Sequence, residues 1–303
     1  MQGRPRAIAS AGLRWILDFL PRNRLGDAAF SAVIFAAHHF RLPRWRRPVT
    51  FNDHLFAMKQ RGELDDPLRR RVTDKHAVKA YIRQVLGPGY SLETLALLTT
   101  AAEIQAFRPE TLPCIVKPTH LSGHVILIED RDQPLDRRRM AAWLELSHYD
   151  WSREANYKGL PPAVMAEEYF VDAAGGVPQD FKIFCIAGRA KFVQVIQDRF
   201  GATTKSLYAR DWNKLPFRIS YPAEGLVPRP DCLGEMLELA ERLAAPFSFI
   251  RVDFLLADGR LKIGELTNLP ENALGIFMPK DYDRRLGRLF ADPRLEIEAV
   301  LEA

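Results

Sequence analysis

The stretch at residues 249–272, FIRVDFLLADGRLKIGELTNLPEN, contains two apolar runs separated by Asp258-Gly259. An Asp-Gly pair between apolar runs is typical of the tight turn of a β-hairpin, so the stretch predicts two antiparallel strands. Asp253 lies in the first strand and Glu265 in the second, each among aliphatic residues. Because a buried carboxylate is costly without a positive partner, each acid is expected to meet a cation.

The length of the turn decides whether the two acids face each other, because side chains alternate between the faces of a strand. A two-residue turn would pair Asp253 with Gly264 and direct Glu265 to the opposite face. A three-residue loop at 257–259, or an equivalent bulge, would make the acids diagonal neighbours on one face. We expect the second arrangement, since paired carboxylates suit Mg²⁺. The alternative is that both acids are solubility residues of an edge strand.

The rest of the chain predicts an α+β protein. Five further segments have the composition of strands, at residues 114–117, 125–128, 163–170, 180–186 and 191–196. Helices are expected at 51–59, from an N-cap at Thr73 to Gly87-Pro88, and from Asp231 onward. The last of these has one apolar stripe, formed by Leu233, Met236, Leu237, Ala240, Leu243 and Ala244. The regular alternation of strand and helix that builds a parallel sheet is missing, so we expect more than one sheet.

Composition indicates an ordinary soluble globular protein, since 47% of the 303 residues are hydrophobic and 27% are charged. Three widely spaced cysteines argue against a disulfide framework and a zinc site. The apolar runs 15–20 and 28–40 are shorter than the roughly 18 residues needed to cross a bilayer. These features together predict a cytoplasmic protein.

The first 48 residues are basic, with nine arginines and two aspartates. A local positive charge suits phosphate groups or an anionic membrane surface, so a peripheral contact at the inner face of the membrane is one expectation for this region. The alternative is a helical hairpin packed on the body. Nucleic-acid binding is not expected, because aromatic residues are not interleaved with the arginines as a stacking platform requires.

The opening stretch resembles the metal-binding strands of ATP-grasp enzymes such as D-alanine:D-alanine ligase. The resemblance rests on Arg251-Val252-Asp253, the hairpin, and the run from Glu265 to Asn268. It implies that Asp253 and Glu265 bind Mg²⁺ and that Arg251 acts on the transferred phosphoryl group. The Glu-x-Asn-Thr order of the family is Glu-x-Thr-Asn here. Asn268 is therefore expected as the third metal ligand, with Thr267 as the alternative.

The same resemblance implies which residues bind ATP. Lys117, at the end of a strand, would contact the α- and β-phosphates, and the loop containing Ser122 and Gly123 would close over them. The hinge strand would contact the adenine and ribose, and two more lysines would supply the remaining cations. The implied nucleotide-binding residues of the hinge and the lysines are Glu167, Glu168, Tyr169, Lys75 and Lys182. For Lys75 or Lys182 alone, the alternative is a solvated surface lysine.

Several segments together resemble the TupA-like ATP-grasp proteins, a group associated with cell-surface polysaccharide genes. They include FNDHL at 51–55, TDKHAV at 73–78, DFKIFC at 180–185 and GELT at 264–267. The resemblance implies an ATP-grasp fold in which two α+β subdomains clasp the nucleotide. The expected regions are a basic helical extension (1–48), an N-terminal part (49–110), a small subdomain (111–168) and a large subdomain with the metal site (169–303).

The function implied by the resemblance is Mg-ATP-dependent ligation of a carboxylate to an amine through an acyl-phosphate. The substrates would be linked to a surface glycan or glycopeptide, and Arg199 is a second candidate catalytic residue beside Arg251. One alternative is a kinase that phosphorylates a sugar or lipid-linked sugar. Another is a non-catalytic nucleotide-binding scaffold.

Overall fold

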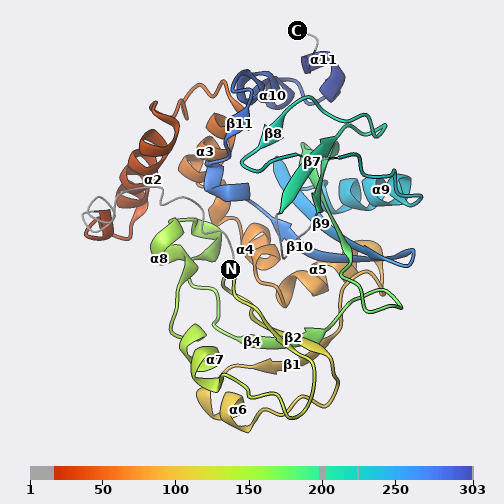
Figure 1. Ribbon diagram of the computed structural model, residues 1–303. Coiled ribbons are helices and arrows are strands. Elements are labelled where there is room, and N and C mark those ends of the chain that lie inside the picture. Colours follow the sequence, from red (N-terminus) through yellow and green to blue (C-terminus); the bar gives the residue numbers. More distant parts are fainter. Residues whose placement is uncertain (1–16, 198–202, 224, 302–303) are drawn as a thin grey trace.

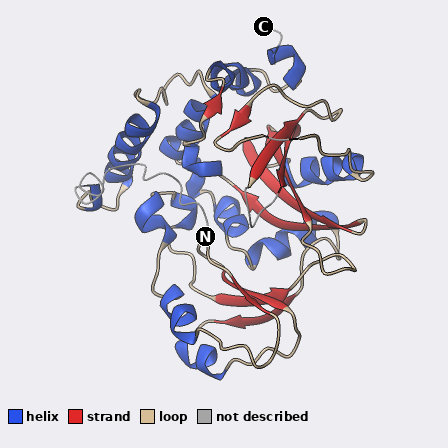
Figure 2. Cartoon of the chain, viewed as in Figure 1, coloured by secondary structure: helices blue, strands red, loops and turns tan. Residues whose placement is uncertain are grey.

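The computed structural model describes residues 17–197, 203–223 and 225–301 and contains two antiparallel sheets of four and five strands. In Figure 1 the smaller sheet lies at the bottom of the view and the larger at the right, with helices α4 and α5 drawn between them. Figure 2, where strands are red, shows the same two groups with helices around them. The α+β class expected from the sequence is confirmed.

The smaller sheet has the strand order β1-β4-β2-β3. Its strands are β1 (Thr94–Leu98), β2 (Cys114–Pro118), β3 (Ile126–Ile128) and β4 (Val164–Glu168). One face packs on α6 (Ala101–Ala106) and α7 (Arg137–Trp143) through a core that includes Val116, Ala166 and Trp143. The other face carries Lys117 and Glu167.

Strand β1 was not anticipated, and it belongs to the region 49–110. It pairs with β4, so the smaller sheet begins before the boundary placed at residue 111. Strand β1 joins this sheet through hydrogen bonds to a strand distant in sequence, with Leu98 opposite Val164, and a local sequence pattern does not reveal such a partner.

The larger sheet has the order β10-β9-β5-β6-β7. Its strands are β5 (Gln179–Ile186), β6 (Arg189–Gln197), β7 (Thr204–Tyr208), β9 (Phe249–Ala257) and β10 (Arg260–Thr267). Helix α9 (Leu233–Ala244) packs on one face through the expected apolar stripe, in which Met236, Ala240 and Leu243 are fully buried. Strand β7 was not anticipated.

The opposite face of the larger sheet is covered by the remaining terminal elements. Phe184, Phe192 and Phe249 of the sheet pack there with Phe51, which opens a helix capped by Thr50. The helices of this layer are α2 (Arg24–His39), α3 (Phe51–Arg61), α10 (Asp281–Ala291) and α11 (Ile297–Leu301). The short pair β8 (Arg218–Ile219) and β11 (Phe277–Met278) forms a third sheet.

Thr73 does not cap the helix that follows it, contrary to the expectation. It ends α4 (Pro67–Thr73), and its hydroxyl donates to Arg69 O at 2.7 Å. Asp74 instead binds the amides at the start of the next helix, α5 (Ala77–Leu86). Its carboxylate accepts from the amides of His76 and Ala77 at 2.9 and 2.7 Å. Both residues are good caps, and only the hydrogen bonds of the folded chain distinguish them.

The remaining short helices lie in the connections. They are α8 (His148–Ser152) and the 3₁₀ turns η1 (Glu63–Asp65), η2 (Ala155–Tyr157) and η3 (Pro270–Ala273). Within the parts of the chain that the structure describes, no helix is long and apolar enough to cross a membrane.

Candidate functional site

The β9–β10 hairpin brings its two acids together, but not through the expected loop. Ala257 pairs with Arg260, so the turn consists of Asp258 and Gly259 alone, both with positive φ (49° and 70°). The three-residue loop is therefore wrong. The register instead shifts between Ile263 and Glu265, so that Gly264 is a bulge and Asp253 lies directly opposite Glu265. The bulge supplies the extra residue that places both acids on one face.

A row of charged residues crosses three strands of the larger sheet. Asp253 on β9 lies between Glu265 on β10 and Lys182 on β5, because it is paired with both. Lys182 Nζ is 2.5 Å from Asp253 Oδ2 and 3.0 Å from Asp180 Oδ1. Lys182 is thus held within a network of ion pairs, whereas the alternative was a solvated lysine.

Arg251 joins the two acids. Its Nε and Nη2 donate to the two carboxylate oxygens of Asp253, both at 2.6 Å. The same Nη2 is 3.3 Å from Glu265 Oε1 and 3.0 Å from Thr267 Oγ1. Bidentate contacts of this kind fix the plane of the guanidinium as well as its charge. Arg251 therefore presents a preorganised cation between the two carboxylates.

The electrostatics keep Glu265 and Arg251 ionised, whereas burial raises the pKa of Asp253 above its ordinary value. Burial acts to raise the pKa of Glu265, but Lys75, Arg251 and Lys182 outweigh it and hold the pKa well below the usual range. Burial acts to lower the pKa of Arg251, but Asp253 and Glu265 raise it above its ordinary value. At neutral pH the glutamate is an anion and the arginine a cation.

Asn268 lies on the opposite side of β10 from the acids. Its Oδ1 accepts from Arg69 Nη1 at 2.9 Å, and its Nδ2 donates to Arg69 O at 3.1 Å and to Thr73 Oγ1 at 3.0 Å. These bonds fasten β10 to α4 and use the amide fully. In the structure Asn268 is thus bonded to α4, and its expected role as a metal ligand stays a prediction. Thr267, which donates to Glu265 Oε1 at 2.9 Å, is on the side of the carboxylates.

The smaller sheet contributes a second charged group. Lys117 Nζ is 2.5 Å from Glu167 Oε2, and Lys79 Nζ is 2.7 Å from Glu167 Oε1. Burial acts to raise the pKa of Glu167, but these two lysines lower it. Lys79 was missed by the sequence reasoning, although it follows Lys75 by four residues, a spacing that repeats a helical face.

Lys75 connects the two charged groups. It donates to the carbonyl of Leu121, at the start of the loop that contains Ser122 and Gly123. Burial lowers the pKa of Lys75, while Glu265 opposes this and Lys117 adds to it. Lys75 is therefore close enough to interact with both the larger-sheet acids and the smaller-sheet lysines.

The other residues expected to bind the nucleotide lie outside these two charged groups. Ser122 and Gly123 are exposed, and Gly123 has a φ of 78°. Glu168 accepts from the Glu93 amide at 2.9 Å, and Tyr169 is half-buried. Arg199 lies outside the described residues. A pocket of about 740 Å³ runs along α5 and the segment before β1 and reaches Lys79.

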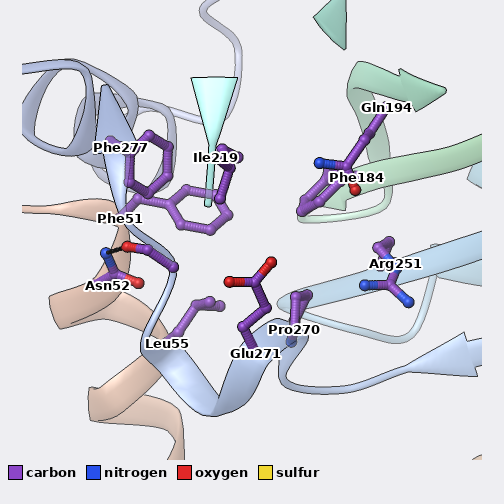
Figure 3. Close-up of a pocket in the computed structure, with 11 residues that line it drawn as sticks. Phe51, Asn52, Leu55, Phe184, Gln194, Ile219, Arg251, Pro270, Glu271 and Phe277 are labelled. Carbon is purple, nitrogen blue, oxygen red and sulfur yellow. Dashed lines mark hydrogen bonds between the residues drawn. The ribbon is translucent and has the colours of Figure 1, made fainter. Parts of the chain in front are cut away.

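A smaller pocket, of about 20 Å³, adjoins Arg251 (Figure 3). Its walls include Phe51, Leu55 and Ile219, and the carboxylate of Glu271 points into the space between them. Ser220 Oγ donates to Glu271, and Lys205 Nζ is 3.6 Å from Glu271 Oε1.

The backbone at this pocket is strained. Glu271, Asn272 and Ala273 have φ values of 51°, 54° and 60°, which are unfavourable for residues other than glycine. Such strain is found where a side chain must be held in a particular place. The Glu271 carboxylate points into the pocket from this segment (Figure 3).

The side-chain donors here are oxygen atoms, the kind of ligand that Mg²⁺ prefers. Among the described residues no group of three or more His, Cys, Asp or Glu side chains could hold an ion. Mg²⁺ is commonly held by one or two carboxylates together with substrate phosphates. Asp253 and Glu265 meet that need, and Thr267 adds a hydroxyl beside them.

The chain was compared with known proteins. The family model described as TupA-like ATPgrasp matches residues 56–291. No curated protein matches the chain in sequence. An L-amino acid ligase from Bacillus licheniformis matches in structure with a TM-score of 0.44 and 15% identity, covering 73% of this chain and 50% of that one. A D-alanine–D-alanine ligase from Bacillus anthracis matches with a TM-score of 0.40 and 16% identity, and the match covers 76% of this chain and 65% of that one.

An ADP complex of a carboxyaminoimidazole ribonucleotide synthetase has a TM-score of 0.41 and 14% identity, and the match covers 68% of this chain. This chain spans 47% of that synthetase and 65% of the D-alanine–D-alanine ligase. The chain thus spans about half to two thirds of the length of these proteins.

Proposed function

The chain belongs to the TupA-like ATP-grasp family, and we propose that it is a Mg-ATP-dependent ligase that joins a carboxylate to an amine. The observation that carries the proposal is the direct pairing of Asp253 with Glu265, bridged by Arg251 and faced by Lys75. This arrangement offers a place for a magnesium–phosphate complex between fixed cations.

We propose the following roles. Asp253 and Glu265 would hold Mg²⁺, which when bound would neutralise phosphate oxygens and act as a Lewis acid. Lys117 and Lys75 would bind the phosphates of ATP, and Lys79 would hold Glu167 in place. Arg251 would stabilise the charge on the transferred phosphoryl group. The exposed loop at Ser122 and Gly123 would cover the phosphates.

The chemistry needs no side-chain nucleophile. The γ-phosphoryl group would pass from ATP to the carboxylate, which gives an acyl-phosphate and ADP. The amine would then attack the acyl carbon, expel phosphate and lose a proton to give the amide. Cations held in fixed positions suit these two reaction steps. They already face the oxygen atoms on which negative charge develops, so they need not rearrange during the reaction.

We propose that the amino group of one substrate enters the pocket of Figure 3, whose volume of about 20 Å³ admits a small group and not a whole substrate. Arg251 borders both this pocket and the acids, so a group bound there would lie beside the phosphoryl position. The carboxylate of Glu271 would accept a hydrogen bond from the neutral amine. The rest of the substrate would lie outside the pocket, and in this family we expect it to be part of a cell-surface glycan or glycopeptide.

The proposal includes the cellular compartment in which the reaction takes place. The three cysteines are free thiols, two of them buried, as expected in a reducing compartment. We therefore place the reaction in the cytoplasm, where ATP is supplied.

Hydroxylamine trapping tests the reaction type. With Mg-ATP and a panel of carboxylates, a ligase forms a hydroxamate from the acyl-phosphate, whereas a sugar kinase yields a phosphomonoester without any amine. The double variant Asp253→Asn/Glu265→Gln should abolish the product, and the variant Asp258→Asn in the exposed turn should not. Phosphomonoester formation would favour the kinase, and absence of Mg-dependent ATP turnover with any acceptor would favour a scaffold.

A further inference from the structure

Helix α2 is apolar on the side that faces away from the protein as well as on the side that packs on it. On the inner side Phe30, Ile34 and Phe35 are buried in the core shared with α3. On the outer side the apolar residues recur at intervals of three or four, which places them on one helical face. Within the helix they are Leu25, Ala29, Val33 and Ala36, and Phe40 follows directly after the helix ends.

This outer face is unusually exposed for its composition. Leu25, Val33 and Phe40 are 82%, 38% and 90% exposed. Between Leu25 and Phe40 the sequence has a single Asp, Glu, Lys or Arg, which is Asp27. Asp27 is bound from the protein side, by Arg153 at 2.9 Å and by Tyr149 at 2.6 Å. No formal charge therefore remains to solvate the outer face.

Helix α9 shows the ordinary alternative. It buries one apolar stripe and exposes Glu235, Glu238 and Arg242 on the other side. A helix that is apolar all round is normally covered on all sides. Helix α2 lies at the outer edge of the molecule in Figure 1, with the body of the protein on one side only.

Arginines flank the apolar face at both ends. Arg24 opens the helix, and Arg44, Arg46 and Arg47 follow its end, all exposed. Within the described parts of the chain none of these four forms an ion pair. Two apolar side chains among them, Phe19 and Leu42, are 72% and 74% exposed. The surface therefore combines apolar side chains with unneutralised positive charge.

From this combination we infer that the outer face of α2 lies on an anionic lipid surface. Its apolar side chains would enter the headgroup boundary while the flanking arginines meet lipid phosphates. Because the inner side of α2 is fixed to α3, the helix would lie along the surface. This inference does not depend on the proposed reaction.

Charge argues against the other ways of covering this face. A second copy of the chain would bring two sets of arginines together. Residues 1–16 add Arg4, Arg6 and Arg14 and no acid, so they would also increase the positive charge. Only an anionic partner gains from both the apolar and the charged part of the surface.

Vesicle flotation tests the inference with the full chain. The protein should float with vesicles that contain phosphatidylglycerol and should not float with phosphatidylcholine alone, and added salt should weaken the binding. The double variant Leu25→Asp/Phe40→Asp should lower the partition coefficient on the order of tenfold or more. Both positions are exposed, so the variant should fold, which circular dichroism checks. The matched control is Leu226→Asp, at a site 77% exposed in the loop before α9.

A second variant separates the charged part from the apolar part. Arg44→Gln/Arg46→Gln/Arg47→Gln should also weaken binding to phosphatidylglycerol, and its residual binding should depend less on salt. Equal binding to both lipids, or unchanged binding of Leu25→Asp/Phe40→Asp, would overturn the inference. So would a dimer in sedimentation that this double variant dissociates, because the face would then be covered by a second copy.

Discussion

The two sides of the candidate site are charged differently. On the side of the smaller sheet, Lys79 and Lys117 share one carboxylate, Glu167, and Lys75 adds a further cation nearby. On the larger sheet, Lys182 and Arg251 are matched by Asp253 and Glu265. On the lysine side, formed by Lys75, Lys79, Lys117 and Glu167, positive charges outnumber negative ones, which suits phosphates. On the carboxylate side, formed by the larger-sheet residues, two acids are available to a metal.

The largest effect is expected from Asp253→Asn. This change removes the charge that orients Arg251 and, in our proposal, holds Mg²⁺, so Mg-dependent ATP turnover should fall on the order of a thousandfold. Release of ADP at several Mg²⁺ concentrations measures it. Asp258→Asn, in the turn of the same hairpin, is the control. A rate within a few-fold of the wild type would show that the carboxylate side is structural.

The variant Asn268→Ala tests the side of β10 that faces α4, as distinct from the side that carries the acids. The change removes one hydrogen-bond partner from each of the buried residues Arg69 and Thr73, so the free energy of unfolding should fall by about 1–3 kcal/mol. Urea denaturation measures this loss. The affinity for Mg-ATP should stay within about threefold, since Asn268 faces α4. A large loss of affinity at unchanged stability would instead identify Asn268 as a metal ligand.

Lys117→Ala tests the lysine side. Loss of one charge-assisted contact to phosphate should weaken ATP binding by about 10- to 100-fold, measured by calorimetry with a non-hydrolysable analogue. Lys79→Ala should weaken it less, because in our proposal Lys79 positions Glu167. Lys280→Ala, at an exposed site before α10, serves as the control. An affinity unchanged by Lys117→Ala would mean that phosphates bind elsewhere.

The smallest effect concerns pH. Burial lowers the pKa of Lys75, so its charge is lost at a lower pH than the roughly 10.4 of an ordinary lysine. Only the protonated lysine attracts phosphate, so ATP affinity should decline as the pH rises, and the decline should begin below the roughly 10.4 of an ordinary lysine. Lys75→Arg should reduce the decline, because arginine stays charged at these pH values. Parallel pH curves for the two proteins would contradict this reading of the lysine side.

Local pattern was enough to predict most strands of both sheets and the stripe of α9. It failed at Thr73, where two good caps stand side by side, and at β1, whose partner is β4. Lys79 was missed for a similar reason, since a single lysine on a helix is ordinary until its partner is known. Each failure lies where a contact distant in sequence decides the outcome.

The hairpin shows the same limit in its register. The sequence contains the Asp-Gly turn, and the structure has it as a two-residue turn. The sequence does not show that Gly264 is a bulge. Close to the bulge, the Ile263 amide donates to Tyr90 O at 2.7 Å, so β10 is bonded on its outer edge by a segment far away in the chain. That bond exists only in the folded protein.

The sequence by itself determined the residue types, their alternation along the strands, and the family. Only the tertiary structure decided that Asp253 faces Glu265, that Thr267 rather than Asn268 stands beside them, and that Glu167 joins Lys79 to Lys117. The physical reason is that alternation assigns a side chain to one of two faces. Which face becomes the site depends on strand pairing and on hydrogen bonds, such as those of Arg69, that close only when distant segments meet.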